Sequence, residues 1–367
     1  MIINWLYEKT YFKIMKLFNL DCHISVIEDL KNIFEKLGYS VDSWSISGHN
    51  WVFNRNPVNV DIINSSNWRN LTPKMCDSFY ERYKDELSKY DGFICTYPLT
   101  FSLLYEKFNK PIILHVPIRY ETPFENKREQ WIAFNEYLRN GIDSKKIFPI
   151  ANSYYDKEYF EFFVNRKCGF IPNICDYTNT IWSPKLDKFL YYSRLNIPLD
   201  SDLIVNKNNL DKYSWEQLSE YKGIITIPYN CSTMSLFEFY TSNIPIFCPS
   251  INFMIELYSK HNSSVLSEIT WNQVFNHSPG SIISCDINND PNKYDDINIM
   301  GNWIKLSDFY NQESMPHIIY FDSFDDMYLK LNNTDLESVS NKMKEFNKIK
   351  KNKVYDEWSK LLNSIYE

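Results

Sequence analysis

Apolar, strand-like runs alternate with amphipathic, helix-like segments along most of this 367-residue chain. The runs GFICTY (residues 92–97) and PIILHV (residues 111–116) are continuously apolar, whereas residues 75–90 place apolar side chains at helical spacing. Continuous apolar strands separated by amphipathic helices are typical of a parallel sheet covered by helices on both faces. The alternation therefore predicts an α/β fold.

The same alternation occurs twice. Residues 176–188 are polar, contain a proline and separate the first series of strands from a second series that begins with FLYYS. The chain is long enough for two ordinary domains. We therefore expect two doubly wound Rossmann-like domains that face each other across a cleft. The expected divisions are an extension (1–14), an N-terminal domain (15–180), a C-terminal domain (181–335) and a charged helix (336–367).

Composition narrows the class of protein. The net charge is −7 and the basic residues are scattered, which argues against a nucleic-acid surface. The eight cysteines lack zinc-type spacing and are typical of free thiols in a reducing compartment. No apolar run approaches the roughly 20 residues that cross a bilayer, and no signal-peptide core is present. We expect a cytoplasmic protein with no nucleic-acid partner and no transmembrane segment.

Candidate site residues follow the predicted strands. In open parallel sheets, ligands bind outside the carboxyl ends of the strands, so polar side chains at these positions should line one cleft. The residues that directly follow strands are Asp21 and His23 after KLFNL, Arg119 and Glu121 after PIILHVPI, Asn152 after KIFPIA, Arg194 after FLYYS, and Tyr229 after GIITIP.

The most informative stretch is IPYNCSTMSLFEFYTSNIPIFCPS, residues 227–250. A strand leads into a Ser/Thr turn and then a helix, whose first-turn N–H groups suit a diphosphate. Glu238 lies further along this helix, where its carboxylate can accept hydrogen bonds from both hydroxyls of a ribose.

This stretch resembles glycosyltransferases of the GT-B fold, many of which have a small-residue turn, a helix bearing Glu and a strand opened by Pro. YYSRLN (residues 191–196) resembles the family's strand and loop that ends in Gly-Arg-Leu. The resemblance implies a nucleotide-sugar donor on the C-terminal domain, an acceptor on the N-terminal domain, and a final helix that packs back on the N-terminal domain. The implied donor-binding residues are Arg194, Tyr229, Asn230, Ser232, Thr233, Met234, Ser235 and Glu238.

The first loop contains Asp21, Cys22 and His23 where nucleotide-binding α/β proteins usually have glycines. In inverting enzymes of the resembled family, the base that deprotonates the acceptor hydroxyl commonly stands in this loop. Histidine suits this task because its pKa lies near the working pH. The expected catalytic pair is His23 as base and Asp21 as the carboxylate that orients its ring. Arg119, Glu121 and Asn152 are expected to contact the acceptor or line the cleft.

The sequence departs from the family pattern at two positions. Asn230 stands where the retaining branch often has a first glutamate. Leu199 stands where the family usually has a lysine shortly after the arginine, and Lys207 is a candidate to supply the missing positive charge. A non-catalytic protein that binds a nucleotide or a sugar on the same fold therefore stays an alternative. A metal-dependent single-domain transferase is disfavoured because no Asp-x-Asp ends a predicted strand. We expect no metal and no cofactor besides the donor; the acceptor is a glycan, a protein or a small molecule.

Overall fold

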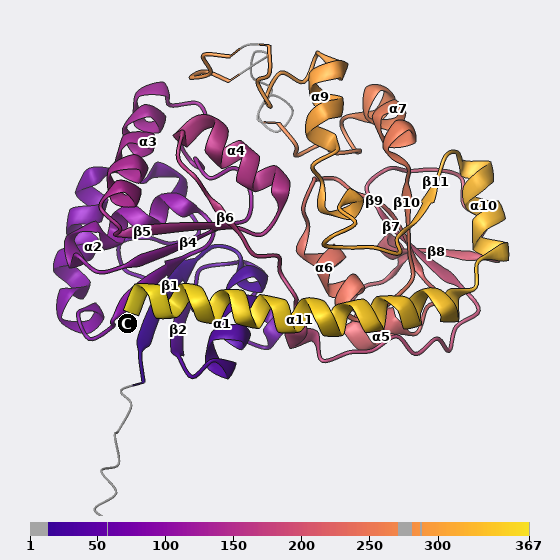
Figure 1. Ribbon diagram of the computed structural model, residues 1–367, viewed down its shortest axis with the longest axis horizontal. Coiled ribbons are helices and arrows are strands. Elements are labelled where there is room, and N and C mark those ends of the chain that lie inside the picture. The colour runs from indigo at the N-terminus through magenta and orange to yellow at the C-terminus, as the bar shows by residue number, and fades with distance from the viewer. Residues whose placement is uncertain (1–13, 57, 271–280, 287, 367) are drawn as a thin grey trace, which may run out of the picture.

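Two parallel β-sheets form two α/β domains that lie side by side. The structure, a computed structural model, describes residues 14–56, 58–270, 281–286 and 288–366. Figure 1 shows the N-terminal domain in indigo and magenta, the C-terminal domain in orange, and the long helix α11 in yellow across both. The predicted fold class is confirmed. The predicted extension, except for Ile14, lies outside the described residues.

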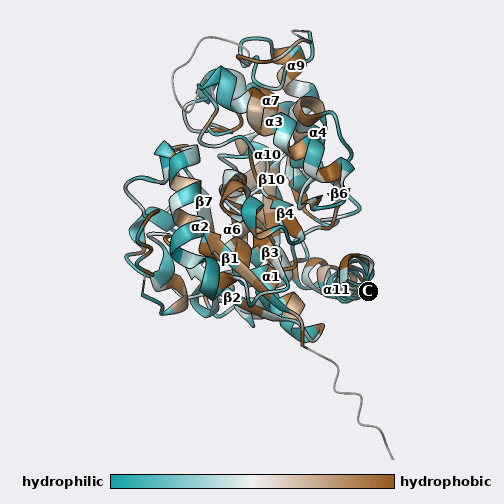
Figure 2. Cartoon of the chain, turned by 90° about the vertical axis from the view of Figure 1, so that its left-hand side faces the viewer, coloured by the Kyte–Doolittle hydropathy of each residue, from teal (hydrophilic) through white to brown (hydrophobic). Residues whose placement is uncertain are grey.

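The N-terminal domain contains a six-stranded sheet in the order β2-β1-β3-β4-β5-β6. Every residue of β3 and β4 is buried, because helices cover both faces of the sheet. Figure 2 shows these central strands in the brown of hydrophobic residues. The strands are β1 Lys16–Asp21, β2 Ser40–Ser45, β3 Gly92–Cys95, β4 Ile112–Val116, β5 Ile147–Ala151 and β6 Gly169–Phe170. The helices are α1 Ile24–Lys36, η1 Asn50–Phe53, η2 Trp68–Asn70, α2 Pro73–Leu87, η3 Leu99–Phe108, α3 Arg128–Asp143 and α4 Tyr154–Val164.

The C-terminal domain contains a five-stranded sheet in the order β11-β10-β9-β7-β8, again with parallel pairing. Its strands are β7 Phe189–Ser193, β8 Ile204–Asn206, β9 Ile224–Ile227, β10 Ile246–Pro249 and β11 Ile319–Phe321. Its helices, with the η4 turn of the connecting segment, are η4 Asp176–Thr178, η5 Lys207–Asn209, α5 Trp215–Ser219, α6 Met234–Thr241, α7 Ile251–His261, α9 Ile297–Ile304, η6 Asp308–Tyr310 and α10 Phe324–Asn333.

Both sheets place their first strand between their second and third strands. The connection after the first strand and the connection after the third strand therefore run in opposite directions along the sheet. They leave a crevice between them at the carboxyl ends of these two strands. In the N-terminal sheet this crevice lies between β1 and β3, and in the C-terminal sheet between β7 and β9. These two points are where a parallel sheet most readily binds a ligand.

Two features fix how the chain passes between the domains. The buried carboxylate of Asp29 on α1 accepts hydrogen bonds from the main-chain N–H groups of Ile174 (3.1 Å) and Cys175 (2.7 Å), where the chain leaves the first domain. Helix α11, Leu336–Tyr366, then returns from the second domain. The indole of Trp358 packs 5.0 Å from the ring of Phe34. None of the described helices combines the length and apolar character that crossing a bilayer requires.

We expect Trp358→Ala to lower the free energy of unfolding by about 3–5 kcal/mol, because truncation of a buried tryptophan leaves a large cavity. Only 1% of the Trp358 surface is exposed, and the side chain packs among core residues of the N-terminal domain. Urea unfolding followed by circular dichroism measures the change. Lys353→Ala on the exposed face of the same helix is the matched control and should change stability by less than about 0.5 kcal/mol. Equal effects of the two substitutions would contradict the docking of α11.

Candidate active site

A cavity of about 790 Å³ lies between the two domains. Residues that follow β1 and β2 form its N-terminal wall, and residues that follow β7, β8 and β9 form much of its C-terminal wall. A second cavity of about 400 Å³ adjoins it on the C-terminal side. The two cavities share Tyr192, Lys207, Tyr229, Ser235 and Phe239. The carboxyl ends of both sheets therefore open into one continuous space.

His23 lies on the N-terminal wall of the larger cavity. It is the residue that precedes α1, and its ring stands edge-on to the ring of Tyr97 with 6.4 Å between centroids. Desolvation by the surrounding protein, with a smaller contribution from the nearby His49, lowers the pKa of His23 below its ordinary value of 6.5. The imidazole is consequently neutral near pH 7 and available as a proton acceptor.

Asp21 does not hydrogen-bond to the His23 ring, so the expected orientation of the imidazole by this carboxylate is not observed. The carboxylate Oδ1 instead accepts hydrogen bonds from the His23 main-chain N–H (2.8 Å) and the Ser45 hydroxyl (2.9 Å). The side chain is fully buried, and burial raises its pKa to about 7. Asp21 thus fixes the main chain of the loop that presents His23.

The turn into α6 forms the C-terminal wall. Tyr229 and Ser235 line both cavities, Thr233 lines the smaller one, and Met234 lines the larger one. Thr233 is the N-cap residue but makes no side-chain capping bond. Its hydroxyl therefore does not satisfy the first-turn N–H groups of α6. The Leu236 N–H donates to the Thr233 carbonyl oxygen at 3.1 Å, which leaves the N–H groups of the cavity-lining Met234 and Ser235 as candidate donors for an anionic ligand.

Glu238 lines the larger cavity from the second turn of α6. Its Oε1 accepts a hydrogen bond from the Tyr177 hydroxyl at 2.6 Å, and the Trp215 side chain also hydrogen-bonds to the carboxylate. Burial raises the pKa of Glu238, and the two hydrogen bonds partly offset this rise. The carboxylate is held in a fixed position opposite the wall that contains His23.

Two cations, Arg194 and Lys207, border the smaller cavity. The guanidinium of Arg194 stacks 3.7 Å from the ring centroid of Tyr229 and pairs with the Glu268 carboxylate at 2.6 Å. The ammonium of Lys207 lies 4.0 Å from the ring centroid of Tyr192 and, within the described residues, forms no ion pair with a carboxylate. Lys207 therefore has the less compensated positive charge.

Six predicted site residues lie outside both cavities, Asp21 among them. Arg119, Glu121 and Asn152 follow their strands as expected, but all three are buried, and Glu121 accepts a hydrogen bond from Tyr159 at 2.6 Å. The expectation that these three line the cleft is not met, because α4 and the second domain cover this end of the sheet. On the donor side, Asn230 accepts from the Cys231 N–H at 2.8 Å, and the buried Ser232 hydrogen-bonds to Asp308.

Several cavity residues are not among those that the sequence predicts. His49 and Trp51 come from residues 48–70, a segment without recognisable periodicity, and Tyr213 and Trp215 stand at the start of α5. The capping box formed by Ser214 and Gln217 is a sequence signal that places Trp215 at the first position of a helix. No comparable signal marks His49 or Trp51.

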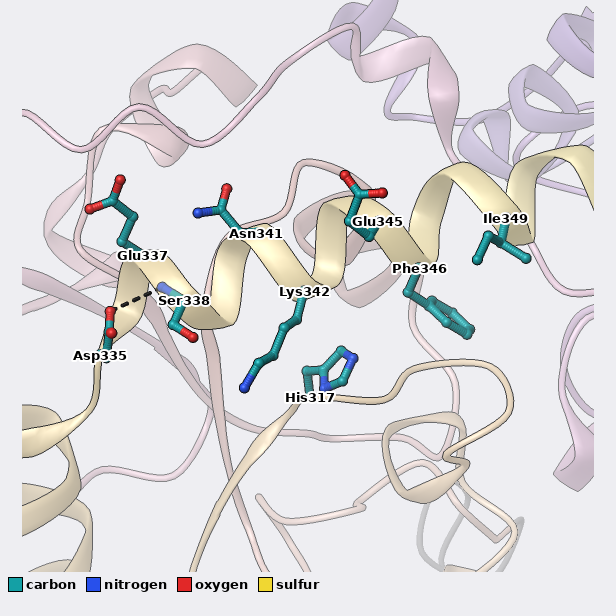
Figure 3. A pocket seen from close by; sticks show the side chains of 9 residues that line it. All are labelled: His317, Asp335, Glu337, Ser338, Asn341, Lys342, Glu345, Phe346 and Ile349. Carbon is teal, nitrogen blue, oxygen red and sulfur yellow. Dashed lines mark hydrogen bonds between the residues drawn. The ribbon is translucent and has the colours of Figure 1, made fainter.

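Another surface hollow lies along α11, where Figure 3 shows His317 close to Lys342, with Phe346 and Ile349 further along the helix. It shares no lining residue with the interdomain cavities and does not lie at the carboxyl ends of the strands. Within the described residues, no group of three or more His, Cys, Asp or Glu side chains is arranged to hold a metal ion. The interdomain space is therefore the candidate active site.

The chain is similar over most of its length to solved glycosyltransferases. The glycotransferase of kitacinnamycin shares 8% identity at a TM-score of 0.45, covering 97% of this chain and 100% of that one. SnogD from Streptomyces nogalater shares 9% identity at a TM-score of 0.42, covering 92% and 95%. The spinosyn rhamnosyltransferase SpnG, solved with thymidine diphosphate, shares 8% identity at a TM-score of 0.39, covering 92% and 96%.

No protein-family model matches the chain, and no curated protein matches its sequence.

We expect Asp21→Asn to stabilise the protein increasingly as the pH rises from about 4 to 8. The pKa of Asp21 in the folded protein, about 7, lies above its ordinary value of 3.8. Between these values the folded protein binds a proton that the unfolded chain has lost, so this group lowers stability as the pH rises. Thermal unfolding at several pH values measures the difference from wild type. The exposed Asp85→Asn serves as the control and should show no such trend. A pH-independent effect of Asp21→Asn would contradict the burial of a titrating carboxyl.

Proposed function

We propose that this protein is a glycosyltransferase that moves a sugar from a nucleotide-sugar donor to an acceptor hydroxyl. One observation carries the proposal: His23 and Glu238, at switch points of two different sheets, line opposite walls of one cavity. The cavity volume of about 790 Å³ is sufficient for a ligand of this size. The donor occupies the C-terminal wall and the acceptor the N-terminal wall.

The donor diphosphate lies at the N-terminus of α6 in this proposal. The first-turn N–H groups and the helix dipole favour an anion there. Lys207 and Arg194 at the cavity border add positive charge. The Glu238 carboxylate accepts hydrogen bonds from the ribose hydroxyls, while Tyr177 and Trp215 hold it in place.

The acceptor hydroxyl oxygen attacks the anomeric carbon of the donor sugar. The bond between that carbon and the diphosphate oxygen breaks, and its electron pair leaves with the nucleoside diphosphate. The hydroxyl proton passes to the neutral imidazole of His23, which its lowered pKa keeps available as a base. The α6 N–H groups and Lys207 stabilise the negative charge that develops on the leaving group. No further cofactor is part of this proposal.

A second candidate function is non-catalytic binding of a nucleotide or a sugar. Two observations favour it: Glu238 already accepts hydrogen bonds within the protein, and Glu268 compensates the charge of Arg194. Titration calorimetry with uridine, guanosine and thymidine diphosphates, followed by an assay of nucleotide release from the matching sugar donors, separates the two functions. Nucleotide release supports the transferase. Binding without release under any acceptor tested supports the binding protein.

We expect His23→Ala to reduce kcat/KM for transfer by about 10²–10⁴-fold, because a general base typically contributes this much. The wild-type rate should fall on the acid side with a midpoint below pH 6.5, since protonation of His23 removes the base and its pKa is lowered. Donor binding should change little. His261→Ala, an exposed histidine at the end of α7, is the control. An unchanged rate for His23→Ala would remove this residue from the mechanism.

We expect Lys207→Met to weaken binding of a nucleoside diphosphate by about tenfold or more, whereas Arg194→Met weakens it less. The charge of Arg194 is already balanced by Glu268, but Lys207 forms no ion pair in the described part of the chain. Loss of one charge-assisted contact corresponds to about 1.5–3 kcal/mol. Calorimetry with the diphosphate and with the uncharged nucleoside isolates the phosphate contribution. Equal losses for both ligands, or a larger loss for Arg194→Met, would contradict this assignment.

A further inference from the structure

Trp51 leaves 54% of its surface exposed and lines the interdomain cavity on the same wall as His23. A tryptophan carries a large apolar surface, and its burial would stabilise the fold. An exposed tryptophan inside a cavity is placed to contact a ligand. Single apolar residues scattered over a protein surface carry no such implication. The chemistry around the indole then indicates what kind of ligand it contacts.

The exposure of Trp51 results from ordered structure on both sides of it. The buried Asn50 donates a hydrogen bond from Nδ2 to the carbonyl oxygen of Ser45 at 3.0 Å. Phe53 packs edge-on against Tyr177 and in a tilted arrangement against Trp215, with centroids 5.3 Å and 5.6 Å apart. The η1 turn is anchored through these two neighbours, and the indole between them remains directed to the cavity.

Polar groups surround Trp51 on its wall. His23 and His49 lie on the same side of the cavity, together with Ser25 and Asn54. The facing wall contributes Lys212, Ser214, Glu216 and Gln217. An extended apolar acceptor would strip water from these groups without replacing their hydrogen bonds, which costs free energy for each unpaired group.

We propose that the acceptor presents a sugar ring to this wall, and that the chain therefore adds its sugar to a saccharide or glycoside. One face of a pyranose is made of C–H groups, which stack on the electron-rich face of an indole. The ring hydroxyls hydrogen-bond to the histidine, serine and asparagine side chains, and one of them points to His23. This assignment of the acceptor rests on the proposed transferase function.

The test combines binding and turnover. Saturation-transfer NMR with methyl glycosides of glucose, galactose, mannose and N-acetylglucosamine measures sugar binding without any donor. Trp51→Leu keeps an apolar side chain but removes the aromatic face, and Trp51→Phe keeps an aromatic face. Trp182→Leu makes the same change at a partly buried tryptophan that lines neither interdomain cavity.

We expect at least one glycoside to bind to wild type and Trp51→Phe, and its signal to fall at least tenfold in Trp51→Leu but not in Trp182→Leu. In the transfer assay, Trp51→Leu should raise the acceptor KM at least tenfold without changing the KM for the donor. Equal signals in wild type and Trp51→Leu, no binding of any glycoside, or preferential transfer to a flat apolar phenol would overturn the inference. Failure of the transferase proposal is recognised separately, because glycoside binding through Trp51 can persist when no nucleotide is bound or released.

Discussion

The shared strand order of the two sheets is the constraint on which the site depends. Each sheet places its first strand between its second and third, so each has a crevice at its carboxyl edge. Helix α11 runs across both domains, and the two crevices open into one cavity between them. His23 on one loop and the turn into α6 on another thereby line the same cavity without being close in sequence.

Buried and cavity-facing polar groups have different tasks in this arrangement. Asp21 is buried and holds the main chain of His23, while the imidazole itself opens to the cavity. Tyr177 and Trp215 likewise hold the carboxylate of Glu238. Side chains locked in this way lose little further conformational freedom when a ligand binds, which favours accurate positioning. The supporting groups act through the residues that they hold.

The sequence predicted the two α/β units and the location of His23 and most of the α6 turn beside the cavity, because apolar periodicity locates strands and thereby their carboxyl ends. It did not predict which group donates a hydrogen bond to Asp21. The main-chain N–H and the ring of His23 are equally near in sequence, and only the folded structure decides which of them the carboxylate binds. Arg119 and Glu121 also follow a strand, but the packing of α4 and the second domain buries them. His49 and Trp51 belong to a segment without periodicity in the sequence, so only the folded structure reveals that they line the same cavity as Glu238.

A continuous set of aromatic contacts joins the two walls of the cavity. Phe53 follows Trp51 by two residues and packs against Tyr177 and Trp215, and these two side chains both hydrogen-bond to Glu238. A ribose that binds to Glu238 must share the carboxylate with Tyr177 and Trp215. Because Phe53 packs against both of these rings, a shift of either ring would also displace Phe53. The η1 turn that carries Trp51 is therefore connected through these two rings to the Glu238 carboxylate. Such contact is a physical route by which a ligand bound at Glu238 can shift the wall that contains Trp51.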